Sequence, residues 1–99
     1  MSDVSTFIYV LRLIRQDSFG RFTPKEEKAI NEHFDYLKKK LDEGKLILAG
    51  RCQQGEFGIV IFHASSEKEA ESFLDNDPAV KGKVMSAEMH PFLVALTGK

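Results

Sequence analysis

The chain has little cysteine and no excess of charge of either sign. Its one cysteine, Cys52, cannot form an intrachain disulfide, and a single free cysteine is typical of a protein from a reducing compartment. The formal net charge is -1, with acidic and basic residues interspersed along the sequence. No basic stretch suited to a phosphate backbone is therefore present, and we expect no nucleic-acid partner.

Long apolar runs are also missing. No run approaches the roughly 20 residues that a helix needs to span a bilayer, so no membrane partner is expected. The polar start carries Asp3 where a signal peptide would carry basic residues, and this favours a cytoplasmic protein. A length of 99 residues predicts one domain over residues 1–99.

The most clearly marked element is a helix over residues 24–43. Thr23 is a suitable N-cap, Pro24 suits the first helical position, and Glu26 completes the capping-box spacing. Gly44 can adopt the left-handed conformation that closes a helix. Four apolar residues at helical spacing form a stripe that we expect to face the core: Ile30, Phe34, Leu37 and Leu41.

The remaining elements define the fold class. Runs rich in β-branched and aromatic residues predict strands over residues 7–14, 46–52, 57–64 and 85–92. Ser66 and Glu69 repeat the capping-box spacing before a second helix over residues 67–74. The order β–α–β–β–α–β is that of the ferredoxin-like α+β fold, a four-stranded antiparallel sheet with two helices on one face.

The strands carry more apolar surface than two helices can cover. In the first three strands apolar residues occur at both odd and even positions, so both faces of the sheet need cover. A twofold-related copy packing sheet against sheet would supply the second cover, and we predict a homodimer. The alternative is a monomer with a large exposed apolar face, which is rare among soluble proteins.

His33 is the first candidate for chemistry because it lies at the edge of the apolar stripe, between core and water. The histidines His33, His63 and His90 do not have the spacings of metal ligands, so we expect no metal site and no cofactor. Three arginines, Arg12, Arg15 and Arg51, are candidates for binding an anionic substrate group, although each could equally be solvated. Glu88 has the same strand parity as His90 and is a further candidate for the cleft, although its position favours a solvated carboxylate.

Several of these features together resemble the YciI-like (YCII-related) proteins. They are His33 within a helix, the Gly44–Lys45–Leu46 stop, Gly50, the Asp77–Pro78 pair after the second helix, and Pro91–Phe92. The resemblance implies a ferredoxin-like subunit of the dimeric α/β barrel superfamily, many of whose members act on small cyclic or aromatic compounds. It also implies a cleft with a histidine–aspartate pair, here His33 and Asp77. The chain departs from the family pattern at Ile30, where relatives often have arginine, and at Arg51, where they have proline.

A histidine–aspartate pair has a definite chemistry. A carboxylate bonded to one ring nitrogen fixes the tautomer and leaves the other nitrogen as a general base. The sequence thus favours a small-molecule enzyme, such as a lyase, an isomerase or a dehalogenase-like protein, with His33 and Asp77 as catalytic residues. The alternatives are a non-catalytic module that binds a small ligand, or a structural dimer in which His33 is a helix-edge residue and Asp77 only an N-cap.

Overall fold

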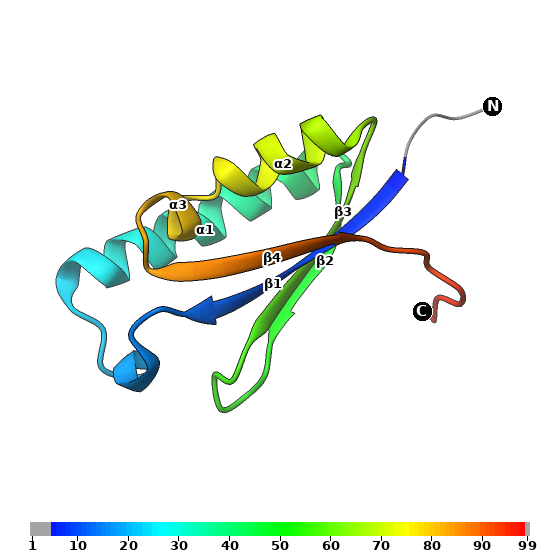
Figure 1. Ribbon diagram of the computed structural model, residues 1–99. Helices are drawn as coiled ribbons and strands as arrows, with labels where there is room; N and C mark the ends of the chain where they lie inside the picture. The colour runs from blue at the N-terminus through cyan, green and yellow to red at the C-terminus, as the bar shows by residue number, and fades with distance from the viewer. Residues whose placement is uncertain (1–4, 99) are drawn as a thin grey trace.

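The computed structural model describes residues 5–98 and has the predicted element order (Figure 1). The strands are β1 (Ser5–Leu13), β2 (Leu46–Arg51), β3 (Gly58–Ala64) and β4 (Met85–Pro91). The helices are α1 (Pro24–Asp42), α2 (Glu67–Asp75) and the single turn α3 (Pro78–Lys81), with a short 3-10 turn, η1, at Gln16–Ser18. The strands form one antiparallel sheet in the order β2-β3-β1-β4, which confirms the ferredoxin-like α+β fold.

All the helices lie on one side of the sheet, and the core fills the space between the two layers (Figure 1). Side chains alternate across a strand, so every second residue of β1 and β3 faces the helices. From α2, Phe73 stacks on Phe62 of β3 with ring centroids 4.1 Å apart. The buried residues of the two central strands that belong to this core are Phe7, Tyr9, Leu11, Val60, Phe62 and Ala64, and Ile61 is buried on the other face of the sheet.

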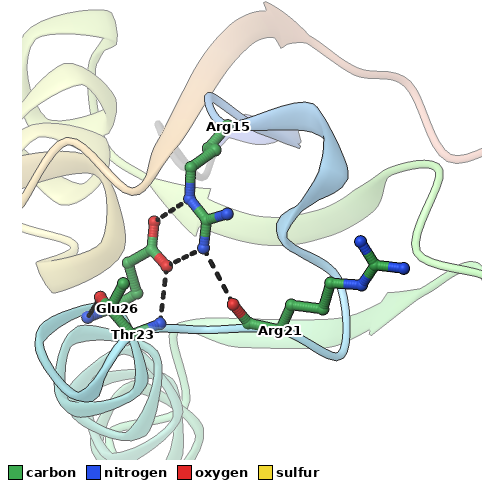
Figure 2. Close-up of polar contacts among 4 residues, drawn as sticks. All are labelled: Arg15, Arg21, Thr23 and Glu26. Carbon is green, nitrogen blue, oxygen red and sulfur yellow. Dashed lines mark hydrogen bonds and ion pairs between the residues drawn. The ribbon is translucent and has the colours of Figure 1, made fainter.

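The start of α1 is fixed as predicted. The Thr23 hydroxyl accepts a hydrogen bond from the Glu26 backbone N–H, and the Glu26 carboxylate accepts one from the Thr23 N–H. The Arg15 guanidinium also binds the Glu26 carboxylate, through Nε at 3.0 Å and Nη2 at 2.5 Å, which ties the β1–α1 connection to the helix (Figure 2). At the other end Gly44 has φ +78°, the left-handed conformation expected of it.

The second predicted capping box is only half present. The Ser66 hydroxyl accepts a hydrogen bond from the Glu69 backbone N–H, as expected. The Glu69 carboxylate, however, binds Ser65, whose backbone N–H and hydroxyl both donate to it at 3.0 Å. Ser65 gives the carboxylate two hydrogen bonds, whereas the backbone N–H of the N-cap Ser66 could give it only one.

The predicted core-facing stripe of α1 is wrong in half of its members. Leu37 is buried, but Phe34 is 62% and Leu41 54% exposed. The helix is rotated so that Ala29, Tyr36 and Lys40 turn toward the core side instead. Lys40 is tolerated there because its ammonium group lies 5.2 Å and 5.5 Å from the ring centroids of Tyr36 and Phe73.

Strand β2 lies at the edge of the sheet, and four of its six residues are exposed, whereas the sequence predicted a strand covered on both faces. The sheet face opposite the helices carries Ile8, Val10 and Ile59, which are half-buried, and Ile61, which is buried, and no described helix lies over this face (Figure 1). Among the residues described, no helix is both long and apolar enough to cross a membrane.

Candidate active site

The structure brings His33 and Asp77 into direct contact. His33 comes from the middle of α1, and Asp77 is the N-cap of α3 at the end of the connection from α2. The Nδ1 atom of His33 lies 2.7 Å from Oδ1 and 2.9 Å from Oδ2 of Asp77. Pro78 holds this connection in place because its ring fixes the first residue of α3, and the Asp77 carboxylate accepts a hydrogen bond of 2.9 Å from the Ala79 N–H.

Tyr9 is the third member of the site, and sequence reasoning missed it. Its hydroxyl donates a hydrogen bond of 2.6 Å to Oδ2 of Asp77, and both residues are fully buried. Burial, together with the charge of Asp77, raises the pKa of Tyr9 far above its usual value, so the hydroxyl stays a donor. The available signal was a hydroxyl group in β1 at a core-facing position, since Tyr9 lies between Phe7 and Leu11 on the same face of the strand.

These contacts define the state of the histidine ring. An ionised carboxylate only accepts hydrogen bonds, so Nδ1 of His33 carries the proton that is shared with Asp77. In the neutral ring Nε2 is then an unprotonated acceptor. His33 is half-buried and forms part of the wall of a groove, so this nitrogen is the one available to a small molecule.

The groove runs between α1 and the β2–β3 hairpin and has a volume of about 590 Å³. Phe19 is one of the lining residues, and its ring packs against the hairpin turn at Gly55. A Cβ atom at Gly55 would lie 2.5 Å from that ring, and the backbone there has φ +80°, so only glycine fits. The other lining residues are mainly apolar and include Phe22, Ile30, Phe34, Leu41 and Leu46.

Of the predicted charged residues, only Arg51 lines this groove. Its guanidinium lies over the Phe19 ring, 5.1 Å from the centroid, and Nη1 donates to the carbonyl oxygens of Cys52 and Gln53 at 3.2 Å. Nε and Nη2 keep donors for an anion. Ile30 also lines the groove, and a second cation in the groove wall comes from Lys38, whose ammonium group lies 5.8 Å from the centroid of the Phe34 ring.

Arg12 and Glu88 lie on the opposite face of the sheet, away from the His33–Asp77 contact. Arg12 alternates with the buried Leu11, and Glu88 is paired in register with Val10 on that same face. Arg12 lies over the Phe57 ring at 5.3 Å, and Glu88 is 2.5 Å from Nε2 of His90. The pleat of the strands therefore separates these two residues from the candidate site within one chain.

No group of three or more potential metal ligands occurs among the described residues. The candidate site is a histidine–aspartate–tyrosine cluster beside an apolar groove in a ferredoxin-like α+β protein. The sequence matches the family model of the YCII-related domain over residues 7–93, and the chain belongs to this family.

A solved structure shares the fold. It is the 5-chloro-2-hydroxyhydroquinone dehydrochlorinase from Burkholderia phenoliruptrix, in complex with 2,5-dihydroxybenzoquinone. The TM-score is 0.59 at 17% sequence identity, and the alignment covers 88% of this chain and 93% of that chain. Comparison with curated protein sequences gives no match.

Proposed function

We propose that this protein is a small-molecule enzyme in which Nε2 of His33 is the general base and Asp77 holds the imidazole in the required tautomer. The observation that carries the proposal is the contact between His33 and the buried Asp77 carboxylate at the wall of the groove. The pair has the geometry of a base and its orienting group, within hydrogen-bond distance of each other.

A purely structural role for Asp77 accounts for less of the site. Capping α3 requires one hydrogen bond, from the Ala79 N–H to Oδ1. The same carboxylate also binds His33 and Tyr9, and it is completely buried. A buried carboxylate is costly unless it is well paired, so three donors around it favour a site in which the charge itself is used.

The proposed reaction begins with proton abstraction. Nε2 of His33 removes a proton from a carbon or hydroxyl oxygen atom of the substrate, and the electron pair of the broken bond forms a new C=C or C=O bond. On a chlorinated hydroquinone the proton removed is a hydroxyl proton of the keto tautomer, in which the carbon that bears chlorine is tetrahedral. In an elimination the leaving group departs with its own bonding electrons, as chloride would. In an isomerisation the proton is returned to a different carbon. After an elimination the protonated ring loses its proton to water and is neutral again, whereas in an isomerisation the return of the proton to the substrate restores the neutral ring.

Two features of the groove support a small cyclic or aromatic substrate. The phenylalanine rings of Phe19, Phe22 and Phe34 offer flat apolar surfaces, and Arg51 offers one cation for an anionic group. The fold is shared with a dehydrochlorinase that was solved with a dihydroxybenzoquinone, a compound of this class. We propose elimination of a halide from such a ring as the first reaction to test.

We further propose that the protein acts as a homodimer. Ile8, Val10 and Ile59 are half-buried apolar residues on the sheet face opposite the helices, around the buried Ile61, and this is the surface that a second sheet would cover. Arg12 and Glu88 lie on the same face and would then belong to the interface or to its rim.

The test uses 5-chloro-2-hydroxyhydroquinone as the probe, with chloride release as the readout. We expect His33→Gln to reduce chloride release at least 100-fold, because general-base catalysis typically contributes about 10²–10⁴-fold. Asp77→Asn should give a comparable loss. In ¹⁵N NMR spectra of the unaltered protein, the ring of His33 should be protonated at Nδ1, and this preference should be lost in Asp77→Asn.

The chain contains a matched control. His90 lies 2.5 Å from the carboxylate of Glu88 but sits on the other face of the sheet, so His90→Gln makes the same chemical change at a second histidine–carboxylate pair. Its chloride release should be unaltered. Equal losses in His33→Gln and His90→Gln would contradict the proposal, and tight binding of the probe without any turnover would favour a non-catalytic binding module.

A further inference from the structure

An apolar surface borders the open side of the groove. It consists of Phe34 and Leu41 on α1 together with Leu46 and Leu48 on β2, and all but Leu46 are exposed. All four residues also line the groove itself, so the surface is the exposed part of the groove wall and is continuous with the candidate site. β2 is an edge strand, and its outer backbone groups have no partner strand among the described residues.

The second exposed apolar feature is the C-terminal segment, residues 92–97. Its side chains are apolar except for Thr97, and it contains no charged residue. Leu93 is 90% and Leu96 94% exposed, which leaves two leucines almost entirely in water. A continuous apolar run without alternation is typical of a segment that is covered on both sides. In Figure 1 this segment leaves the end of β4 and runs away from the sheet.

The segment cannot make full contact with the apolar surface of its own chain. It continues from β4, while the surface lies at β2, on the opposite edge of the sheet. The two edges are three strand spacings apart, or about 14 Å. Crossing that width would use at least about four of the six residues, at roughly 3.4 Å per residue, and would leave about two for contact.

We propose that residues 92–97 of a second copy of the chain dock on the surface formed by Phe34, Leu41, Leu46 and Leu48, and that they close the open side of the groove that contains His33. This inference rests on the proposed homodimer but not on the proposed chemistry. The proposed contact explains both exposed apolar features, because the C-terminal segment of one chain would cover the apolar surface of the other chain and would itself be removed from water. By twofold symmetry each tail then contributes to the partner's site, and each site is complete only in the dimer.

Cross-linking between two different variants tests the contact directly. In a Cys52→Ser background, one protein carries Leu96→Cys and the other Leu48→Cys, and the two are mixed, allowed to exchange subunits and oxidised. We expect a disulfide-linked heterodimer on non-reducing gels, since only a tail on another chain brings these two positions together. The control mixes Leu96→Cys with Ile14→Cys, because Ile14 is an exposed apolar residue outside the proposed surface.

A second measurement does not depend on disulfide geometry. Leu93→Asp/Leu96→Asp should raise the dissociation constant of the dimer at least tenfold by analytical ultracentrifugation, whereas Ile14→Asp should leave it unaltered. The tail residues are exposed in the single chain, so the fold should survive, and circular dichroism checks this.

Equal heterodimer yields with Leu48→Cys and Ile14→Cys would overturn the tail contact. So would an intrachain disulfide in a monomer that carries both Leu48→Cys and Leu96→Cys. A tail variant that still dimerises with the original constant would overturn it too, while leaving the proposed dimer and chemistry standing. Sedimentation of the unaltered chain as a monomer would remove both the tail contact and the dimer.

Discussion

At the scale of single residues, the site is organised by one buried charge. Asp77 is fully buried and receives hydrogen bonds from three parts of the chain: β1 through Tyr9, α1 through His33, and the start of α3 through Ala79. Removing a hydrogen-bond donor from a buried carboxylate usually lowers the free energy of unfolding more than removing a donor from an exposed carboxylate. The buried carboxylate cannot replace the lost hydrogen bond with one to water. The carboxylate therefore links the chemistry to the stability of the fold.

Tyr9→Phe should reveal this link. The change deletes only the hydroxyl that donates to Asp77, and we expect the free energy of unfolding to fall by about 1.5–3 kcal/mol. Tyr36→Phe is the matched control, since the Tyr36 hydroxyl donates to the uncharged carbonyl of Phe73 at 2.7 Å, and its loss should cost about 0.5–1.5 kcal/mol. Urea denaturation measures both. A larger loss of unfolding free energy in Tyr36→Phe than in Tyr9→Phe would contradict a stabilising role for the hydrogen bond from Tyr9 to Asp77.

The same two tyrosines should make the folded protein less stable at high pH. Burial raises the pKa of Tyr9 strongly and that of Tyr36 to about 12, with the charge of Asp77 adding to both shifts. Because the folded-state values are raised, this stabilisation is fully present below the unfolded pKa of about 10 and declines as pH rises toward 12. Since the chain has two tyrosines and no tryptophan, ultraviolet absorbance should show almost no tyrosinate at pH 10 before unfolding. Full ionisation of one tyrosine at that pH in the folded protein would contradict this prediction.

At the scale of elements, α1 is held at its start by more than its own capping box. Arg15, just after β1, binds Glu26 of the first helical turn and the carbonyl oxygen of Arg21 in the connecting segment (Figure 2). The hydrogen bonds from the Arg15 guanidinium, followed by the hydrogen bond from the Thr23 backbone N–H, lower the pKa of Glu26 to about 2. The helix that carries His33 thus begins at a position fixed relative to β1.

Glu26 should therefore make stability depend on pH on the acid side. Its folded-state pKa lies below the unfolded value of about 4.5, so its stabilisation is present above that pH and is lost as pH falls through 2. We expect Glu26→Gln to flatten the change of melting temperature between pH 5 and pH 2. Glu27→Gln, the neighbouring acidic residue of the same turn, is the control and should keep the original slope. If the melting temperature of Glu26→Gln changed with pH as steeply as that of the unaltered protein, Glu26 would not be the source of the acid-side pH dependence.

The rotation of α1 can be tested with two residues of the predicted stripe. Leu37 is buried, so Leu37→Ala should lower the free energy of unfolding by about 2–5 kcal/mol at any protein concentration. Phe34 is exposed in the single chain, and Phe34→Ala should matter only through association, so its effect should vanish on dilution. Lys39→Ala, on the solvent side of α1, should stay within about 0.5 kcal/mol. A loss in Phe34→Ala that is independent of concentration would mean that the helix faces the core as the sequence first suggested.

At the scale of the whole molecule, the uncovered sheet face predicts how the chain assembles. We expect a dimer at micromolar concentration in sedimentation experiments, with an interface above the roughly 1,200–2,000 Å² of standard complexes. Val10→Asp places a charge in the middle of this face and should give a monomer, whereas Ser86→Asp, at the β4 edge of the same face, should remain dimeric. A stable monomer of the unaltered chain would show that the apolar face is tolerated in water.

The sequence by itself determined the fold class, the order of the elements and both members of the His33–Asp77 contact. Caps and strands are local signals: Thr23, Glu26 and Gly44 mark the ends of α1 whatever surrounds it, and period-two or continuous apolar runs mark strands. The contact itself required more than local signals, and the resemblance to the YCII-related proteins supplied it.

Only the tertiary structure decided which side chains share a space. Tyr9 joins Asp77 because β1 lies beneath the end of α2, a proximity across 68 residues of chain that no spacing encodes. The sheet order makes β2 an edge, and this leaves Phe34 and Leu41 beside an open groove although they belong to one apolar stripe. Because side chains alternate along a strand, Arg12 and Glu88 lie on the sheet face opposite the groove that Arg51 lines. Helical periodicity and strand runs describe one element at a time, whereas burial depends on which elements become neighbours.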